Sequence, residues 1–531
     1  MSFKVIIEML KILITDPLHE SAIEILKEAG EVEIATGISI EEIKQKIKDA
    51  DALVVRSGTT VTKEIIDASE NLKVIARAGV GVDNVDLDAA TEKGVVVVNA
   101  PDASSISVAE LMFGLMLSAA RNIPQATASL KKGEWDRKSF KGMEVYAKTL
   151  GIVGLGRIGQ QVAKRAQAFE MNIVAYDPYI PENVASELGI KLLSVDELCA
   201  ESEFITLHVP LTTKTKHMIG KTQFDLMKNN TIIINCARGG LIDENALYDA
   251  INCGKVKAAG LDVFEEEPPT KNPLISLNGL IGTPHQGAST EEAQLSAGTI
   301  VAEQTVKILK GESAENVVNL PMVPTEKMKK LMPYLVLAEK MGSMSIQYLD
   351  NSIDIVEITY MGDLAKEKTE MLKRAFLKGI LSPILLAGVN LVNAPVIAKN
   401  RNIRLVEGIM AESDYGNSIK IVARGKNDEI SLIGSIEHKE VVFREINGYR
   451  MDIKPEGTIC IIKHIDRPGM VGKVGLILGE HGINIAGMQV GRKEPGGHSI
   501  MFLDIDHMIP EEVMDEIKKI ENVRAVRAIN I

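Results

Sequence analysis

The sequence predicts an α/β protein with two doubly wound parallel-sheet domains, followed by two smaller α+β domains. Short, fully apolar runs alternate with helical patterns over residues 11–290, which is typical of parallel strands covered by crossover helices. A glycine-rich turn at 154–159 lies between such a strand and a helix. The composition changes at 317–324, and other strand patterns follow. A length of 531 residues leaves room for about three to four domains.

Composition and charge exclude several classes of protein. Apolar residues make up 45% and charged residues 25%, as in an ordinary globular protein and unlike a disordered or fibrous one. The 60 basic and 72 acidic side chains give a formal net charge of −12. We therefore expect neither nucleic acid nor an anionic membrane as a partner, because both require a basic surface. The cysteines are far apart and form no C-x-x-C pair, so we expect no disulfide framework and no metal site, and a cytoplasmic location: Cys199, Cys236, Cys253 and Cys460.

Two segments bear on export and membranes. Residues 1–16 carry Lys4, Glu8 and Lys11 within an apolar run and lack a small-residue cleavage site, so we expect no signal peptide. Residues 379–398 have no charge and are long enough to span a bilayer. Their prolines, glycines and asparagines favour a buried helix–loop–strand piece instead.

The predicted strands follow the apolar runs in chain order. In the first part they lie at 11–16, 52–57, 73–79 and 95–100. In the second part they lie at 149–155, 172–177, 204–210, 231–237, 258–263 and 280–285. Residues 106–120 form an apolar helix with almost no polar face, which favours burial between domains or subunits.

The last third has a different pattern. After a linker at 317–324 we predict a helical stretch and then strands that include 354–360, 417–425 and 430–436. Residues 457–531 read strand, helix, strand, strand, helix, strand. This order is typical of a small ferredoxin-like domain.

A dinucleotide-binding turn is predicted at GLGRIG (154–159). Gly154 permits the tight turn, Gly156 lets the backbone approach a pyrophosphate, and Gly159 lets the helix pack on the strand. The helix N-terminus then offers free N–H groups to the phosphates. Asp177 ends the next strand, where a carboxylate accepts hydrogen bonds from the ribose hydroxyls and repels a 2′-phosphate. The sequence therefore predicts NAD, rather than NADP, as the cofactor.

Three later strands end in polar residues on the cofactor side of the sheet. They bring Arg238, a glutamate from 265–267, and His285 to the edge where open α/β sheets bind ligands. Reduction of a 2-keto acid requires a proton donor and a cation for the carboxylate and carbonyl. Histidine suits the first task and arginine the second, while a glutamate bonded to the imidazole favours its protonated form.

Five motifs in this order resemble the D-2-hydroxyacid dehydrogenase family: RAGVGVDNVD (77–86), GLGRIG (154–159), NCARGG (235–240), DVFEEEPP (262–269) and PHQGAST (284–290). The resemblance implies a catalytic triad of Arg238, Glu267 and His285, with Val80 and Gly81 holding the substrate carboxylate. It also implies contacts with NAD from the glycines of the turn and from Arg157, Ile158, Asp177, Val209, Cys236, Ala237, Arg238, Asp262 and His285. We expect Glu265 and Glu266 to be solvated, His208 to pack beside the groove, and Cys236 to be a wall residue.

Arg56 and Arg77 end two strands of the first domain and suit a phosphate group in the cleft. The resemblance then implies oxidation of D-3-phosphoglycerate to 3-phosphohydroxypyruvate, the first step of L-serine synthesis. Ser104 and Gln286 depart from the asparagine and leucine that are common in the family, and both touch the expected cleft. Two alternatives stay open: a glyoxylate or hydroxypyruvate reductase, and a dinucleotide-sensing corepressor-like scaffold without activity.

Residues 457–531 resemble an ACT regulatory domain, with the turn DRPG (466–469) and the segment GINIAGM. The resemblance implies pairing of edge strands between subunits and L-serine as an inhibitor, bound by His464, Asp466 and Asn484. We expect a homodimer or homotetramer. The domains predicted in this way are a discontinuous substrate-binding domain (1–105 and 291–317), a Rossmann-like NAD-binding domain (106–290), an intervening α+β domain (318–455) and the ACT domain (456–531).

Overall fold

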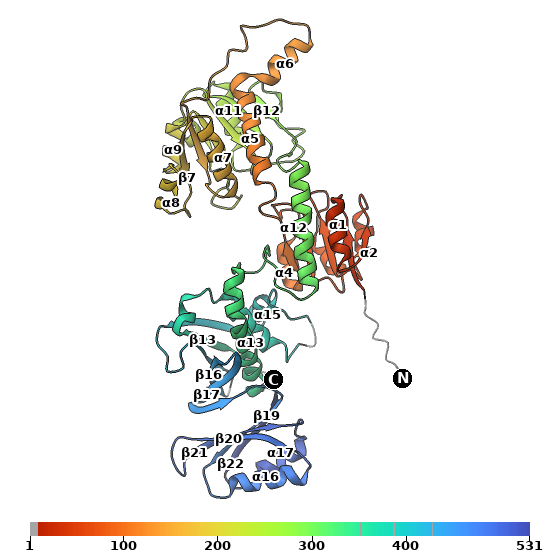
Figure 1. Cartoon of the computed structure of the whole chain (residues 1–531), viewed down its shortest axis with the longest axis vertical. Helices are drawn as coiled ribbons and strands as arrows, with labels where there is room; N and C mark the ends of the chain where they lie inside the picture. Colours follow the sequence, from red (N-terminus) through yellow and green to blue (C-terminus); the bar gives the residue numbers. More distant parts are fainter. Residues whose placement is uncertain (1–8, 351–352, 386–387, 427) are drawn as a thin grey trace.

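The structure of the protein is a computed structural model that describes residues 9–350, 353–385, 388–426 and 428–531. Residues 1–8, on which part of the signal-peptide prediction depends, lie outside the described residues. Four regions, each built on a sheet, succeed one another along the long axis of the molecule (Figure 1). Two sheets are parallel, one is mixed and one is antiparallel, which confirms the predicted fold class.

The first parallel sheet carries helices on both faces. Its strands in spatial order are β2 (Gly30–Ile34), β1 (Leu10–Ile14), β3 (Ala52–Val55), β4 (Val74–Arg77) and β5 (Val96–Val98). Its helices are α1 (Glu20–Lys27), α2 (Ile40–Lys46), α3 (Lys63–Ala68), α4 (Leu87–Lys93) and, much later in the chain, α12 (Glu291–Leu309). One apolar cluster joins the sheet to α1 and α12, and a second joins it to α2, α3 and α4.

The second parallel sheet has seven strands. They are, in spatial order, β12 (Leu280–Gly282), β11 (Val256–Leu261), β10 (Thr231–Asn235), β9 (Phe204–Leu207), β6 (Thr149–Val153), β7 (Asn172–Tyr176) and β8 (Lys191–Leu192). The helices are α5 (Ser105–Arg121), α6 (Ile123–Lys131), α7 (Arg157–Ala168), α8 (Glu182–Glu187), α9 (Val195–Glu201), α10 (Lys221–Leu226), α11 (Glu244–Asn252) and the 3₁₀ helix η1 (Pro273–Ser276). The chain reverses direction across the sheet between β6 and β9, and such a switch point is where open α/β sheets bind ligands.

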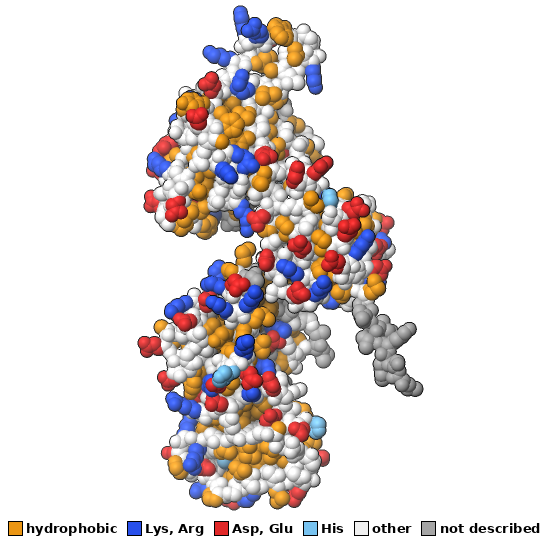
Figure 2. Space-filling model, viewed as in Figure 1, with side chains coloured by type: hydrophobic (Ala, Val, Ile, Leu, Met, Phe, Trp, Pro, Cys, Tyr) orange, Lys and Arg blue, Asp and Glu red, His pale blue; other side chains and the backbone are white. Residues whose placement is uncertain are grey.

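Helix α5 is the apolar helix predicted at 106–120. Its buried side chains pack with α7 against the second sheet. Within the described residues, no single helix is long and apolar enough to cross a membrane, although α5 and α6 pass that test together, with a bend of 65° between them. Acidic and basic side chains are interspersed over the face shown in Figure 2.

The intervening region combines a long helix with a mixed sheet. The strands in spatial order are β14 (Arg404–Met410), β13 (Ile355–Met361), β15 (Ser418–Arg424), β16 (Glu429–Glu437), β17 (Glu440–Ile446) and β18 (Tyr449–Ile453). The helices are α13 (Thr325–Tyr348), η2 (Gly362–Lys366), α14 (Glu370–Leu381) and α15 (Ala394–Asn400). The strand predicted within 379–398 is wrong, because the described part of that segment ends α14 and begins α15. There the side-chain oxygens of Asn390 and Asn393 each accept from the other residue's backbone N–H, in the turn that precedes α15.

The C-terminal region has the predicted order of strand, helix, strand, strand, helix, strand. Its elements are β19 (Thr458–Ile465), α16 (Met470–Glu480), β20 (Ile485–Arg492), β21 (His498–Ile505), α17 (Glu511–Lys518) and β22 (Val523–Asn530). One face of its sheet packs on α16 and α17. The other face contributes Ile461, Phe502 and Ile529 to the apolar core of the intervening region.

The predicted linker at 317–324 begins as an extension of the first sheet. Val317 forms an antiparallel bridge with Val98, and the N–H of Val318 donates to the carbonyl of Val97 at 2.7 Å. The Asn319 side chain accepts from the N–H of Val97 at 2.9 Å and donates to the carbonyl of Val95 at 2.8 Å. The segment is therefore anchored to β5 before it connects to α13.

Candidate functional site

The glycine-rich turn leaves the backbone open between β6 and α7. Gly154 has a φ of 97°, and a Cβ there would lie 2.6 Å from the carbonyl oxygen of His208. A Cβ at Gly159 would lie 2.0 Å from the carbonyl oxygen of Gly154, so helix and turn could not approach so closely with any other residue. A Cβ at Gly156 meets nothing within 4 Å, because this residue faces open space at the N-terminus of α7. The space and the free N–H groups fit a pyrophosphate.

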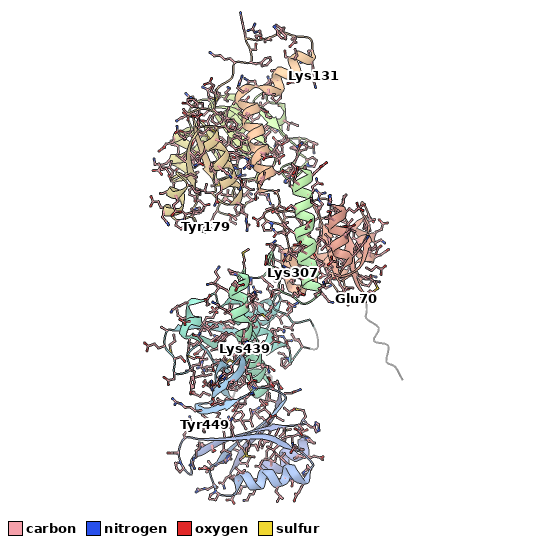
Figure 3. The ribbon with its side chains drawn as sticks, viewed as in Figure 1. Glu70, Lys131, Tyr179, Lys307, Lys439 and Tyr449 are labelled. Atoms are coloured by element: carbon pink, nitrogen blue, oxygen red, sulfur yellow. The ribbon has the colours of Figure 1, made fainter. Side chains whose placement is uncertain are left out.

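Asp177 follows β7 and fastens the turn. Its Oδ2 accepts from the N–H of Leu155, and its Oδ1 accepts from the N–H of Tyr179 (labelled in Figure 3), both at 2.9 Å. Each oxygen keeps a second lone pair, so the carboxylate can also accept from ribose hydroxyls. Arg157, the first residue of α7, forms an ion pair with Asp102 of the segment that leads into α5.

Asp262 is 1% exposed and holds the segment that carries His285. Its Oδ1 accepts from the Thr283 hydroxyl at 2.6 Å and from the N–H of Gln286 at 2.7 Å, and its Oδ2 accepts from the N–H of Gly287 at 2.8 Å. His285 itself has a φ of 51°, which is uncommon for a residue with a side chain. Because all three bonds come from the protein, Asp262 fixes the turn that presents the imidazole.

His285 and Glu267 form the predicted couple. The imidazole Nδ1 lies 2.8 Å from Oε2 of Glu267, and the other carboxylate oxygen accepts from the N–H of Phe264 at 3.1 Å. The His285 side chain is 54% exposed, so its second nitrogen is accessible. With Asp262 and Phe264, the pair lines a cavity of about 640 Å³.

Arg238 reaches from the second sheet to the first domain. Its Nε lies 3.1 Å from Oδ2 of Asp83, and a Cβ at Gly81 would lie 2.1 Å from its Nη2. The guanidinium therefore rests against the backbone that the family resemblance assigns to the substrate carboxylate. Only glycine at residue 81 leaves room for this approach.

Arg77 lies in the same cleft. Burial, followed by the charges of Arg238 and Arg56, lowers the pKa of its guanidinium, although the carboxylates of Asp83 and Asp16 act in the opposite direction. Its Nε is buried and has no hydrogen-bond partner among the described residues. Arg56 donates from Nη1 to the carbonyl of Pro17 at 3.2 Å. The cluster of positive charge is the environment that an anionic ligand would stabilise.

Two predicted wall residues lie beside the turn. Cys236 is 7% exposed, and burial raises the pKa of its thiol, so it is not a reactive thiolate. His208 contacts the Thr206 hydroxyl through Nε2 at 3.0 Å, while its Nδ1 is buried without a partner among the described residues. Burial lowers the pKa of His208 to about 3, so the ring is neutral.

The sequence predicted that Glu265 is solvated. In the structure its side chain is exposed but also pairs with a histidine. Its Oε1 lies 2.9 Å from Nε2 of His217, and its N–H donates to Oε1 of Glu244 at 2.7 Å. His217 is 48 residues earlier in the chain, so the pair could not be inferred from local spacing.

Two of the residues assigned to an effector, His464 and Asp466, lie where β19 ends, whereas Asn484 precedes β20 at the opposite end of the C-terminal sheet. His464 is 2% exposed, and its Nε2 has no partner among the described residues. Asp466 accepts from the N–H of Gly496 at 3.3 Å and from Arg492 at 3.2 Å, and these bonds lower the pKa of its carboxyl. Asn484 donates to Asp506 at 3.1 Å. Each of the three is thus held by a different neighbour and not by the other two.

Comparison with protein families and known proteins agrees with this geometry. Residues 113–287 match the NAD-binding domain of D-isomer specific 2-hydroxyacid dehydrogenases, residues 330–447 match the D-3-phosphoglycerate dehydrogenase intervening domain, and residues 458–522 match the ACT domain. These matches confirm the resemblance inferred from the motifs, and the cofactor is NAD.

Two curated relatives extend over almost the whole chain. D-3-phosphoglycerate dehydrogenase of Methanocaldococcus jannaschii is 65% identical over 524 residues, which is 98% of this chain and 100% of that protein. The Bacillus subtilis enzyme of the same name is 40% identical over 525 residues, again 98% and 100% of the two chains.

Solved structures cover the first two domains. D-lactate dehydrogenase from Aquifex aeolicus, complexed with NAD and lactic acid, is 30% identical with a TM-score of 0.53 and covers 59% of this chain and 99% of its own. A glyoxylate reductase from Paecilomyes thermophila is 32% identical with a TM-score of 0.54 and covers 59% and 98%. The catalytic part is thus shared with other 2-hydroxyacid dehydrogenases, whereas the full-length relatives share all four regions. The chain therefore belongs to the D-3-phosphoglycerate dehydrogenase family.

Proposed function

We propose that the chain oxidises D-3-phosphoglycerate to 3-phosphohydroxypyruvate with NAD, and so catalyses the first step of serine biosynthesis. The observation that carries the substrate assignment is the cluster of Arg56, Arg77 and Arg238 in the cleft. Arg77 there has a buried, unpartnered Nε and a pKa lowered by burial and by the other two arginines. A substrate with a carboxylate and a phosphate would neutralise this cluster, whereas glyoxylate has no phosphate to do so.

The position of each side chain supports the catalytic role that we propose for it. His285 takes the proton of the C2 hydroxyl through its free nitrogen, since the other nitrogen faces Glu267 at 2.8 Å. Glu267 stabilises the imidazolium that forms and fixes the orientation of the ring. Arg238 and the backbone of Val80 and Gly81 hold the C1 carboxylate, and Arg56 and Arg77 hold the phosphate.

NAD fits the turn at 154–159, the end of β7 and the loops after β9 and β10. When bound, it supplies the acceptor for the hydride of C2. Gly154, Gly156 and the first turn of α7 would hold the pyrophosphate, and Asp177 the ribose. Ile158 lies in that first turn and Val209 lies against Gly154, so both would border the pyrophosphate. The remaining predicted contacts would line the rest of the groove: Cys236, Ala237 and Asp262.

The test is an NADH absorbance assay with phosphohydroxypyruvate, glyoxylate and hydroxypyruvate in parallel. We expect kcat/KM to be highest for phosphohydroxypyruvate, and Arg56→Ala and Arg77→Ala to raise its KM by about tenfold or more, because each variant removes a charged hydrogen bond. The KM for glyoxylate should change little. An unaltered KM for phosphohydroxypyruvate in both variants would contradict the phosphate role.

We propose four domains. They are a discontinuous substrate-binding domain at 1–105 and 291–317, the cofactor domain at 106–290, the intervening domain at 318–455 and the ACT domain at 456–531. The separate apolar clusters of the first two sheets support the first division.

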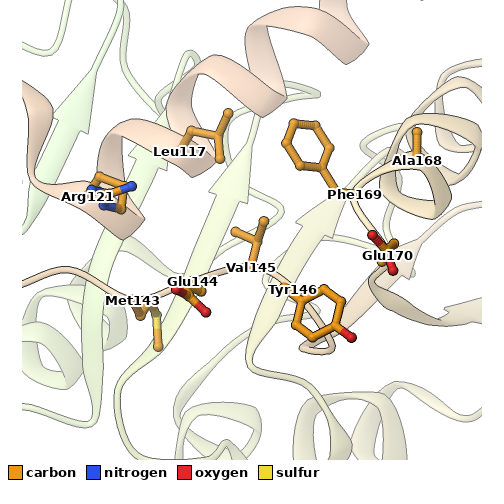
Figure 4. A pocket seen from close by; sticks show the side chains of 9 residues that line it. All are labelled: Leu117, Arg121, Met143, Glu144, Val145, Tyr146, Ala168, Phe169 and Glu170. Atoms are coloured by element: carbon orange, nitrogen blue, oxygen red, sulfur yellow. The ribbon is translucent and has the colours of Figure 1, made fainter.

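We also propose a homodimer built on α5, α6 and the segment after them. Ile123, Leu130 and Trp135 there are 49%, 58% and 80% exposed, and Lys131 lies at the tip of this projection (Figure 3). A cavity of about 410 Å³ lies beside α5 and contains Leu117, Tyr146 and Phe169 (Figure 4). Analytical sedimentation of wild type and Trp135→Glu checks this. We expect the wild type to associate through this interface and the variant not to.

L-Serine is the effector we propose, held between subunits by His464 and Asp466 of one chain and Asn484 of another, since Asn484 lies at the opposite end of its own sheet. The buried, unpartnered Nε2 of His464 supports a polar ligand at this place. Titration calorimetry with L-serine should give binding that is lost in Asp466→Ala, and absence of heat with the wild type would contradict the proposal.

A further inference from the structure

A second histidine–carboxylate pair uses a glutamate two positions before that of the catalytic pair. The segment 264–267 carries both acids: Glu267 faces His285 at 2.8 Å, and Glu265 faces His217 at 2.9 Å. His217 and Glu265 are each a little over one third exposed, at 38% and 37%, so water reaches the pair while the segment stays in place.

His217 also contacts the strand end that carries Arg238. Its N–H donates to the carbonyl of Gly240 at 2.7 Å, and the next residues pair in parallel through a bridge between Ile219 and Ile242. A Cβ at Gly239 would lie 1.8 Å from the carbonyl oxygen of Phe264, so the segments after Arg238 and before Glu265 are in direct contact. His217 thus binds the first of these segments by its backbone and the second by its side chain.

The backbone of His217 is held in an unusual conformation. Its φ is 51°, in the left-handed region that a residue with a side chain rarely adopts. Such conformations persist when surrounding contacts impose them, and they are frequent at functional sites. Glycine would satisfy the backbone at this position, so the imidazole is the feature that needs an explanation.

Hydrogen bonds to Glu244 hold the segment 264–267 next to the His217–Glu265 pair. Besides Glu265, the charged group that faces His217 is Glu244, which accepts from the N–H of Glu265 at 2.7 Å and from the amide of Asn272. Burial and the charge of Glu265 raise the pKa of Glu244, while these hydrogen bonds and the charge of His217 lower it. The start of α11, the segment 264–267 and His217 therefore form one hydrogen-bonded unit.

We propose that His217 and Glu265 are positioning residues, which hold Glu267 and Arg238 in register for hydride transfer. The inference rests on the proposed function, because it assigns no chemistry to His217 itself. A displacement of the catalytic carboxylate by a fraction of an ångström would misdirect His285, and small misplacements of this kind slow a chemical step strongly.

The experiment compares His217→Gly, Glu265→Gln and the double variant with wild type. Glu266→Gln is the matched control, since it makes the same change one residue along, at an exposed side chain outside the pair. Active sites are counted by titration with NADH, and the single-turnover rate of NADH oxidation by phosphohydroxypyruvate is then measured per active site.

We expect each single variant to lower the single-turnover rate about tenfold, with KM values within about twofold of wild type. The double variant should be no slower than the single ones, because both remove the same interaction. A general loss of folded protein would reduce the number of NADH sites and leave the rate per site unchanged. Rates equal to that of Glu266→Gln, or losses that multiply in the double variant, would overturn the inference. Failure of the wild type to turn over phosphohydroxypyruvate would instead overturn the proposed function.

Discussion

The catalytic half and the regulatory half of the chain join their domains in different ways. The two parallel sheets have separate apolar clusters, and polar contacts connect them across the cleft, including Arg238 to Asp83 and Arg157 to Asp102. The intervening and ACT domains instead share one apolar core.

The two kinds of domain contact suit different tasks: relative motion of the two catalytic domains, and transmission of a change between the intervening and ACT domains. Interfaces made of polar contacts allow domains to move, which suits a cleft that must admit substrate and cofactor. A shared apolar core makes two domains respond as one body, because close-packed interiors resist relative sliding. An effector bound to the ACT sheet would therefore act on the intervening domain as a whole.

Polar side chains strengthen the regulatory joint. The Gln347 amide donates to the carbonyl of Asn530 at 2.7 Å and its oxygen accepts from the N–H of Asn530 at 3.1 Å. The cations of Lys463 and Arg527 lie 5.0 and 5.1 Å from the ring of Tyr348. α13 thus carries contacts from the ACT sheet toward the junction with the first domain.

The largest predicted effect concerns chemistry in the catalytic half. His285→Ala should lower kcat about 10³-fold, because it removes the group that we propose as the one exchanging the hydroxyl proton. Thermal unfolding should change little, since the side chain is half exposed. The measurement is the NADH assay with a melting curve, and an active variant would show that another group moves the proton.

The second prediction tests the shared core with adjacent residues on opposite faces of β19. Ile461 lies in the core shared with the intervening domain, and Ile462 lies in the core under α16 and α17. Either change to alanine should cost about 3 kcal/mol of unfolding free energy. Only Ile461→Ala should also raise hydrogen exchange in β15 and β16. Equal exchange in the two variants would mean that the domains are independent.

The third prediction concerns the junction between the halves. Asn319→Ala should destabilise the anchored start of the linker by about 2 kcal/mol, because it leaves the N–H of Val97 and the carbonyl of Val95 without their partner. Limited proteolysis within 317–324 should accelerate while kcat stays near wild type. Unchanged cleavage would show that the anchor contributes little.

The effect that is smallest at neutral pH, where it vanishes, is a pH dependence confined to the cofactor domain. Burial lowers the pKa of His208 to about 3, whereas an unfolded histidine titrates near 6.5. The unfolded state therefore binds a proton that the folded state does not, and stability falls as the pH drops from about 6.5 toward 3. In urea titrations without cofactor, His208→Gln should show a shallower fall than wild type; identical slopes would contradict this.

Local sequence determined much of the fold and part of the site. Apolar runs such as Val95–Val98 can only be buried on both faces, and the glycines at 154, 156 and 159 act through their own backbone, so both are readable without neighbours. Strands β2 and β8 were not predicted from the sequence, because they are short, half-exposed edge strands with charged residues. The strand predicted within 379–398 failed because a short apolar run does not distinguish helix from strand.

Tertiary structure alone decided what lies between segments distant in sequence. The His217–Glu265 pair and the anchoring of Asn319 to β5 join residues separated by 48 and 222 positions, and Ile461 joins a core whose members begin at Leu331. The physical reason is that hydrogen bonds and packing depend on distance in space, whereas residue patterns record only neighbours along the chain. The sequence by itself thus determined the chemistry of the cleft, and the folded chain decided which groups hold that chemistry in place.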